Sequence, residues 1–145
     1  MGFAPISSNA CGWVAAYNAF IAAGMFVHPA DIVRYIESND GLILDGIFGT
    51  NPAIYGMLFG EYGLESTTTF RSASGLGAMA QSGTTAVLCY LHDSGAHFIT
   101  IKWNEEKGHY DVWNGPDDNE PFSSIDDFLN TPGKNRAFIS LTVIN

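Results

Sequence analysis

The sequence has little positive charge. Six lysines and arginines stand against 15 aspartates and glutamates, which gives a formal net charge of −9. A protein that binds nucleic acid needs a basic patch or stripe to neutralise phosphates. The composition therefore argues against nucleic acid as a partner.

Cysteine is scarce as well. The two cysteines, Cys11 and Cys89, lie far apart in the chain, so they form neither a disulfide framework nor the close pair of a zinc site. The spacing of His92, Asp93 and His97 also fits no familiar metal site. We therefore expect two free thiols and no metal, with Cys89 in the core of a strand.

Long hydrophobic runs are missing. The longest one, residues 10–26, is interrupted by polar residues and glycine, and it is shorter than the roughly 20 apolar residues of a membrane span. It predicts a buried helix and no membrane span. No signal-peptide pattern opens the chain, which leaves a cytoplasmic protein or a secreted one after removal of a leader. The sequence gives no indication of the oligomeric state.

What the chain does contain is enough apolar material for one core. It has 145 residues, 46% of them hydrophobic, and no linker or repeat, which predicts one domain over residues 1–145. Helical periodicity in the first half and strands in the second predict an α+β fold, with the first helix central and packed against an antiparallel sheet of four to five strands. The expected helices cover residues 10–23, 29–39, 52–62, 74–81 and 123–129, and the expected strands cover residues 64–70, 85–91, 97–103, 109–113 and 136–144.

Cys11 lies at the predicted start of the first helix, behind Ser8 or Asn9 as the N-cap. Free backbone N–H groups and the positive end of the helix dipole favour a thiolate at such a position. Gly12 is expected to leave the face beside the thiol uncovered. These features suit a nucleophile, although a free cysteine is more often a small buried hydrophobe.

A nucleophilic thiol needs an imidazole nearby and a third group that orients the imidazole. A hairpin with a loop over residues 104–107 pairs Trp103 with Gly108 and places His97 opposite Asn114, while a five-residue loop shifts the register by one. Opposed residues have Cβ atoms about 4.5–5.5 Å apart. Both registers therefore predict that Asn114 lies within reach of His97.

Three segments carry a resemblance to a known family: NACGWVAAYNAF at residues 9–20, GAHFITI at residues 95–101, and VWNGP at residues 112–116. In this order they resemble the papain-like cysteine peptidases, most closely the bacteriocin-processing peptidase domains that cleave double-glycine leaders. The resemblance implies a papain-like fold. It also implies that Cys11 is the nucleophile, that His97 is the general base and then the acid, and that Asn114 orients His97, with Asp117 in reserve for the third role.

The chain departs from the family at one position. The family has a glutamine six residues before the nucleophile, which donates to the oxyanion, and this sequence has Pro5 there. Loss of such a donor typically lowers the rate by about 10²–10³. Either Ser7, Ser8 or Asn9 replaces it alongside the Cys11 N–H, with Asn9 as the favoured candidate, or catalysis is weak or absent.

The expected function is a thiol hydrolase that cleaves a peptide or isopeptide bond through an acyl-thioester on Cys11. Its partner is a peptide or protein substrate, and its chemistry needs no cofactor. The same triad also permits acyl transfer or deamidation. A domain without activity that binds a peptide in the cleft is the alternative from another class, supported by Pro5. If the acidic stretch at residues 117–120 borders the cleft, cationic substrates are favoured.

Overall fold

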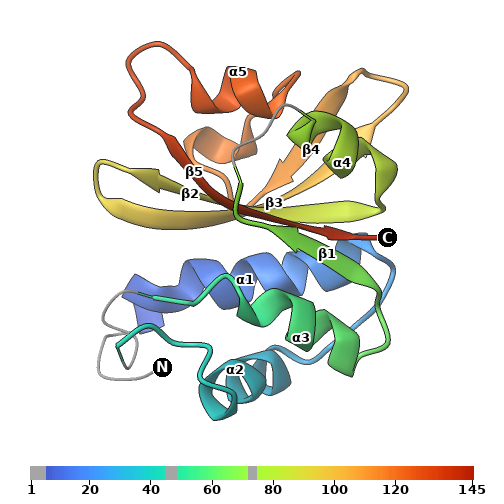
Figure 1. The fold of residues 1–145 in the computed structure, drawn as a ribbon, viewed down its shortest axis with the longest axis vertical. Helices are drawn as coiled ribbons and strands as arrows, with labels where there is room; N and C mark the ends of the chain where they lie inside the picture. Colours follow the sequence, from blue (N-terminus) through green and yellow to red (C-terminus); the bar gives the residue numbers. More distant parts are fainter. Residues whose placement is uncertain (1–5, 45–48, 72–74) are drawn as a thin grey trace.

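The computed structural model describes residues 6–44, 49–71 and 75–145, and for residues 6–9 and Asp117 it describes the backbone alone. Within these ranges the chain forms helices and a sheet, drawn in Figure 1. In chain order the elements are α1 (Ile6–Ala22), α2 (Pro29–Ser38), α3 (Ile54–Glu61), β1 (Ser66–Thr69), α4 (Leu76–Ser82), β2 (Thr85–His92), β3 (Gly95–Asn104), β4 (His109–Trp113), the 3₁₀ turn η1 (Asp117–Asn119), α5 (Ile125–Leu129) and β5 (Ala137–Ile144).

The five strands form one sheet in the order β1-β5-β2-β3-β4, and every neighbouring pair is antiparallel. This confirms the predicted α+β class and the predicted antiparallel sheet. Strand β2 lies in the middle, and its first six residues are buried. A strand covered on both faces is apolar throughout instead of alternating, as the segment TAVLCY at residues 85–90 is.

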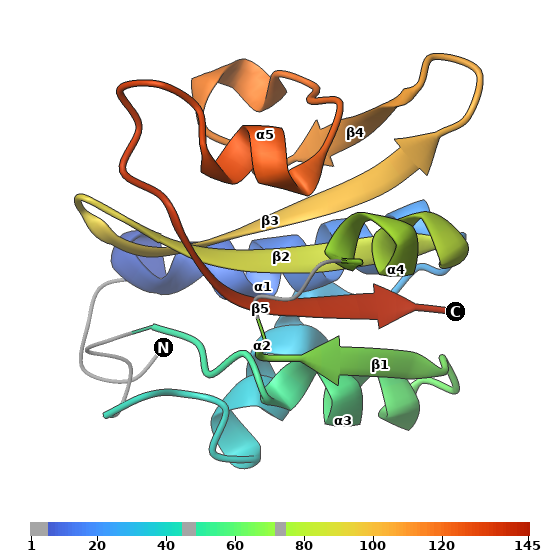
Figure 2. The same ribbon diagram turned by 45° about the horizontal axis from the view of Figure 1, so that its top comes forward.

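Helices cover both faces of the sheet. Figures 1 and 2 show α1 and α3 against one face, α1 under β2 and β3 and α3 under β1 and β5, with α2 beyond them, and α4 and α5 over the other face. Successive side chains of a strand point to opposite faces. Accordingly, Cys89 and Phe98 pack in the core on the α1 side, whereas Leu88 and Ile99 pack in the core beneath α4 and α5.

Helix α1 approaches the sheet closely because its buried stripe consists mostly of small residues. The Thr100 hydroxyl on β3 donates to the carbonyl of Ala15 at 2.7 Å. The sequence predicted a helix covered on most sides, and among residues 10–22 Ile21 alone is exposed, at 47%. The fully buried residues follow helical spacing along a single stripe: Gly12, Ala15, Ala16, Ala19 and Phe20.

Several helix ends follow the predicted local chemistry. The His28 side chain accepts from the N–H of Ala30 and Pro29 follows it in the first turn, while Ser124 caps α5. The start of α1 was predicted wrongly. The helix begins at Ile6, so Ser8 and Asn9 lie inside it instead of capping it. No proline or glycine stands between Ile6 and Ala10 to end the helical backbone.

No helix in the described part of the chain is both long and apolar enough to cross a membrane.

Candidate active site

Cys11 lies five residues after Ile6, the first residue of α1. At that depth an α-helical N–H bonds to the carbonyl four residues earlier, and only the N–H groups of the first turn are left without helical partners. The prediction that Cys11 stands at the helix start is therefore wrong. The end of the helix dipole therefore does not lie at Cys11, where it was expected to stabilise a thiolate.

The surroundings of the thiol also favour its neutral form. Burial raises the pKa of Cys11, while the main-chain N–H groups of Phe98, Gly12 and Cys11 itself act in the opposite direction. The net effect is a pKa of Cys11 above the ordinary cysteine value. The sequence predicted a stabilised thiolate, whereas this environment holds a protonated thiol at neutral pH. Cys89 is buried on β2, as predicted, and burial with the charge of Cys11 raises its pKa to about 12.

Asn114 joins the helix to the sheet. Its Nδ2 donates to the carbonyl of Cys11 at 3.1 Å and to the carbonyl of Phe98 at 2.8 Å. The residue follows directly after β4 and has a φ of +59°, in the left-handed region that asparagine tolerates better than most residues. One side chain thus connects α1, β3 and the end of β4.

The main chain of Asn114 reaches His97. The Nε2 of His97 lies 2.7 Å from the Asn114 carbonyl oxygen. Because a carbonyl only accepts, Nε2 carries the proton and Nδ1 is left with a lone pair in the neutral ring. Burial lowers the pKa of His97, with the Asn114 carbonyl raising it and His92 lowering it further. The imidazole is therefore oriented and neutral, although the group that orients it is the main-chain carbonyl of Asn114 and not the predicted side chain.

No hydrogen bond joins the Cys11 thiol to the His97 imidazole among the described residues. Phe98 packs on the α1 side of the sheet, and its neighbour His97 lies against Tyr90, with 5.8 Å between ring centroids. The contacts of Asn114 with Cys11, Phe98 and His97, here called the Asn114 joint, therefore bring the three predicted triad residues into one neighbourhood without a hydrogen bond between the thiol and the imidazole.

The hairpin register differs from both predicted registers. Asn104 pairs with His109, so the loop covers residues 105–108, and the last pair of the ladder is Thr100 with Trp113. Asn104 belongs to the strand because its carbonyl accepts from the N–H of Gly108 at 2.8 Å, where the chain turns with positive φ. The proximity of His97 and Asn114 is nevertheless confirmed.

Five other predicted residues cannot be placed by their side chains. Pro5 and the side chain of Asn9, the favoured oxyanion donor, lie outside the described residues, as do the side chains of Ser7 and Ser8. Asp117, the reserve third member, lies in η1 with its side chain also outside the described residues. The expectations for the oxyanion donor and for the reserve residue therefore stay predictions.

Sequence reasoning missed Thr50, which covers the face that Gly12 was expected to leave open. A Cβ atom on Gly12 would lie 2.1 Å from the Thr50 Oγ1. Thr50 is 2% exposed and its hydroxyl has no hydrogen-bond partner among the described residues, while the nearby Tyr55 hydroxyl donates to the Gly12 carbonyl at 2.9 Å. No local sequence signal connects Gly12 with Thr50 or Tyr55.

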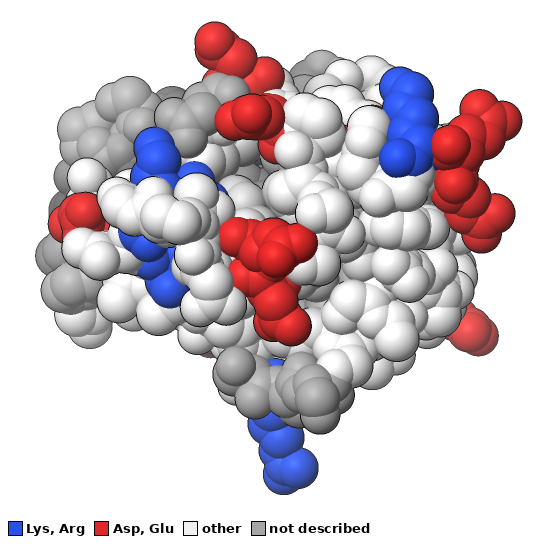
Figure 3. All heavy atoms as spheres, turned by 90° about the horizontal axis from the view of Figure 1, so that it is seen from above, with Lys and Arg blue, Asp and Glu red and all other residues white. Residues whose placement is uncertain are grey.

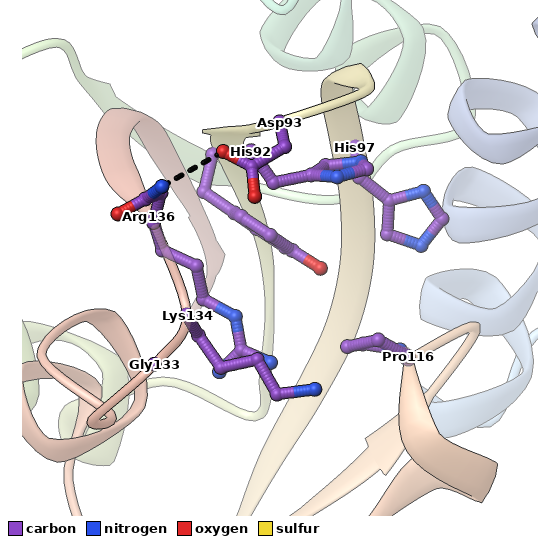
Figure 4. A pocket seen from close by; sticks show the side chains of 10 residues that line it. His92, Asp93, His97, Pro116, Gly133, Lys134 and Arg136 are labelled. Carbon is purple, nitrogen blue, oxygen red and sulfur yellow. Dashed lines mark hydrogen bonds between the residues drawn. The ribbon is translucent and has the colours of Figure 1, made fainter.

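A cavity of about 270 Å³ lies on the other side of His97. Figure 4 shows His97 on one side of it, with Lys134 and Arg136 across the space. His92 and Asp93, considered and rejected as metal ligands, also line it. Within the described ranges, no group of three or more histidines, cysteines, aspartates or glutamates is arranged to hold a metal ion.

The two roles of Asn114 can be separated by substitution. Asn114→Gly keeps the left-handed backbone and the carbonyl that accepts from His97, but it removes both side-chain hydrogen bonds. We expect a loss of about 1–2 kcal/mol in the free energy of unfolding, and about 1 kcal/mol more for Asn114→Ala because of its positive φ. Chemical denaturation measures the loss. The ¹⁵N shifts of His97 report its tautomer, and a change of tautomer in Asn114→Gly would contradict the main-chain assignment.

The lowered pKa of His97 also has a consequence for stability. Below the ordinary histidine pKa of about 6.5, the unfolded chain binds a proton that the folded chain resists. This contribution to stability is full above that value and is lost as pH falls toward the folded pKa, with a slope of at most about 1.4 kcal/mol per pH unit. Denaturation between pH 7.5 and 5 is expected to show a shallower decline for His97→Gln than for the wild type. Equal slopes for the two proteins would contradict the assignment of this pH dependence to His97.

No model of a known protein family matches the chain, and no curated protein sequence matches it either. Any functional assignment therefore rests on the residues and geometry described above.

Proposed function

We propose that the protein is a papain-like thiol hydrolase that cleaves a peptide or isopeptide bond through an acyl-thioester on Cys11. The observation that carries the proposal is the Asn114 joint. Asn114 contacts the carbonyl of Cys11 at 3.1 Å and Nε2 of His97 at 2.7 Å, and so connects residues from three distant segments of the chain. A thiol, an imidazole of fixed tautomer and a group that orients it are the parts that such a reaction requires.

The chemistry follows from the tautomer of His97. Its Nδ1 takes the thiol proton while the Cys11 Sγ attacks the substrate carbonyl and forms a tetrahedral oxyanion. The imidazolium then gives that proton to the leaving amine as the C–N bond breaks, which leaves the acyl-thioester. Water attacks the thioester with Nδ1 again as the base, the carboxylic acid departs, and the proton returns to the thiol.

The resting geometry requires one movement before this sequence begins. Cys11 and His97 are both neutral and share no hydrogen bond among the described residues, so in the proposed reaction the thiol and Nδ1 come within hydrogen-bond distance when a substrate binds. Catalytic hydrogen bonds are often loose before the substrate arrives. The hydrogen bond from Nε2 to the Asn114 carbonyl keeps the tautomer, so the lone pair on Nδ1 stays available as the base.

A domain that binds a peptide without cleaving it is the second candidate. The observations that favour it are the raised pKa of Cys11 and the absence, among the described residues, of a hydrogen bond between the thiol and His97. Acyl transfer and deamidation pass through attack by the same thiol, and they differ from hydrolysis only in the acceptor or in the amide attacked.

Labelling by a peptidyl vinyl sulfone separates these candidates. The probe places an electrophile where the scissile carbonyl would lie, so an active hydrolase forms a covalent adduct at Cys11. Mass spectrometry of the digested protein is expected to locate the adduct on Cys11 and not on the buried Cys89. In His97→Ala we expect labelling to be at least about 100-fold slower. Reversible binding of the probe without an adduct would favour the peptide-binding domain.

A further inference from the structure

We propose that the cavity beside His97 binds a carboxylate carried by the leaving-group side of the substrate. This inference rests on the proposed function and names a substrate class for it. The carboxylate comes either from the free C-terminus of a short leaving segment or from an acidic side chain within it.

The position of the cavity beside His97 indicates which part of the substrate it would bind. In the proposed reaction His97 donates a proton to the leaving amine, so the leaving segment lies next to the imidazole. The imidazole lines the cavity, whereas Cys11 is not among the lining residues and contacts Asn114 through its carbonyl. A volume of about 270 Å³ is just below the range of about 300–1,000 Å³ typical of ligand pockets. It suits one terminal residue or one side chain.

The charge of the cavity selects an anion. The chain has six lysines and arginines at a net charge of −9, and two of those six, Lys134 and Arg136, line this cavity. Figure 3 shows several basic side chains together at the left of the view, beside a hollow. Among the described lining residues the one carboxylate is Asp93, which accepts a hydrogen bond from the Asn135 amide at 3.0 Å.

Arg136 is held in place before any ligand arrives. Its Nη1 donates to the Phe128 carbonyl at 2.8 Å, and its guanidinium carbon lies 3.9 Å from the centre of the Phe128 ring. A guanidinium fixed by a ring and a carbonyl loses little freedom on binding, and its planar donors match a carboxylate. Tyr90 and Pro116 provide apolar walls, which strengthen a charge interaction by excluding water.

This proposal differs from the expectation drawn from the acidic stretch at residues 117–120. Glu120 lines a neighbouring cavity of about 330 Å³, which shares Pro116, Lys134 and Arg136 with the first. The two basic side chains line both cavities, whereas Glu120 lines only the second one. The cavity beside His97 therefore has two basic side chains and, among its described lining residues, the single carboxylate of Asp93.

The test uses the Cys11→Ala variant, which cannot turn over a substrate, and three small probes: acetyl-Ala-Ala with a free carboxylate, its C-terminal amide, and acetyl-Ala-Glu-amide. Each is titrated while amide and imidazole NMR signals are followed. We expect the free carboxylate or the glutamate probe to shift signals of His97 and Arg136 at concentrations where the neutral amide does not. Lys134→Gln and Arg136→Gln are each expected to weaken that binding about tenfold, whereas Lys107→Gln, on the distant hairpin, leaves it unchanged.

The two charged probes distinguish the sources of the carboxylate. Preference for the free C-terminus indicates release of a terminal residue, and preference for the glutamate probe indicates an internal acidic residue. Equal binding of all three probes, or shifts confined to another surface, would overturn the proposal. If Arg136→Gln does not fold, the effect of Lys134→Gln on carboxylate binding tests the proposal alone. This test measures binding and not turnover. If the cavity binds a carboxylate but the wild type has no hydrolase activity, the proposed function is refuted and the carboxylate site remains supported.

Discussion

Replacement of Cys11 by alanine is expected to lower peptide hydrolysis by at least about 10⁴-fold, because the acyl-thioester can form on no other group in the proposed reaction. The fold should tolerate the change. Cys11 is half-buried, and its contact with Asn114 is made through the main-chain carbonyl, which alanine retains. Cleavage of a peptide library, read by mass spectrometry, measures the effect.

Cys89→Ala is the matched control for that experiment. It removes the other thiol, which lies on β2 in the core that packs against α1 and has a pKa raised to about 12. We expect it to retain cleavage within a few-fold and to lose some stability. Equal activity of the wild type and Cys11→Ala would show that any cleavage observed does not use this nucleophile.

Gly12→Ala is expected to destabilise the protein by about 3 kcal/mol. On an unobstructed helix, glycine to alanine stabilises by about 1 kcal/mol, so packing and helix propensity act in opposite directions here. The new methyl group would lie 2.1 Å from the Thr50 Oγ1 and 2.4 Å from its Cβ, which cannot be accommodated without moving the loop or the helix. Packing therefore dominates, and the unfolding midpoint in denaturant should fall.

Gly60→Ala is the matched control, because Gly60 lies in α3 with space around it. Among the described residues, no atom beyond its own stretch of helix lies within 4 Å of the position that its Cβ would occupy. This variant should gain up to about 1 kcal/mol. Thr50→Gly removes the obstructing side chain, so the double variant Gly12→Ala/Thr50→Gly should recover most of the loss relative to Thr50→Gly alone. A gain in stability for both Gly12→Ala and Gly60→Ala would contradict the described contact.

Most elements of the fold could be predicted from the sequence because their signals are local. Alternating residues predicted β5, and Pro29 predicted the start of α2, whereas α5, expected over residues 123–129, begins at Ile125 behind its cap Ser124. The start of α1 was harder to predict. Ser8 and Asn9 are good N-cap residues, but the backbone around them is also free to continue as helix, and no proline or glycine prevents it.

The sequence predicted which three residues lie together but not which of their atoms make the contacts. Cys11, His97 and Asn114 do share one neighbourhood, as the order of their motifs indicated. The atoms that make the contacts depend on the turn after β4, where a φ of +59° at Asn114 directs the carbonyl to His97 and the amide to Cys11. Sequence spacing contains no information about that turn.

Long-range contacts could not be predicted from local sequence signals. Thr50 reaches Gly12 from a segment held by an isolated bridge to Leu42, and nothing near Thr50 in the sequence marks it as a neighbour of the Cys11–Gly12 pair. The upward direction of the Cys11 pKa has the same origin. It results from burial beside the sheet, which depends on the packing of the whole domain and not on helix position.

The most direct test of the central claim is to trap the acyl-thioester. A short incubation of the wild type with the peptide library, quenched in acid, is expected to leave a hydroxylamine-sensitive acyl group on Cys11 in the intact-protein mass spectrum. We expect none in Cys11→Ala and far less in His97→Ala. If the folded wild type binds peptides and shows neither an acyl group on Cys11 nor any cleavage, the protein is not a thiol hydrolase.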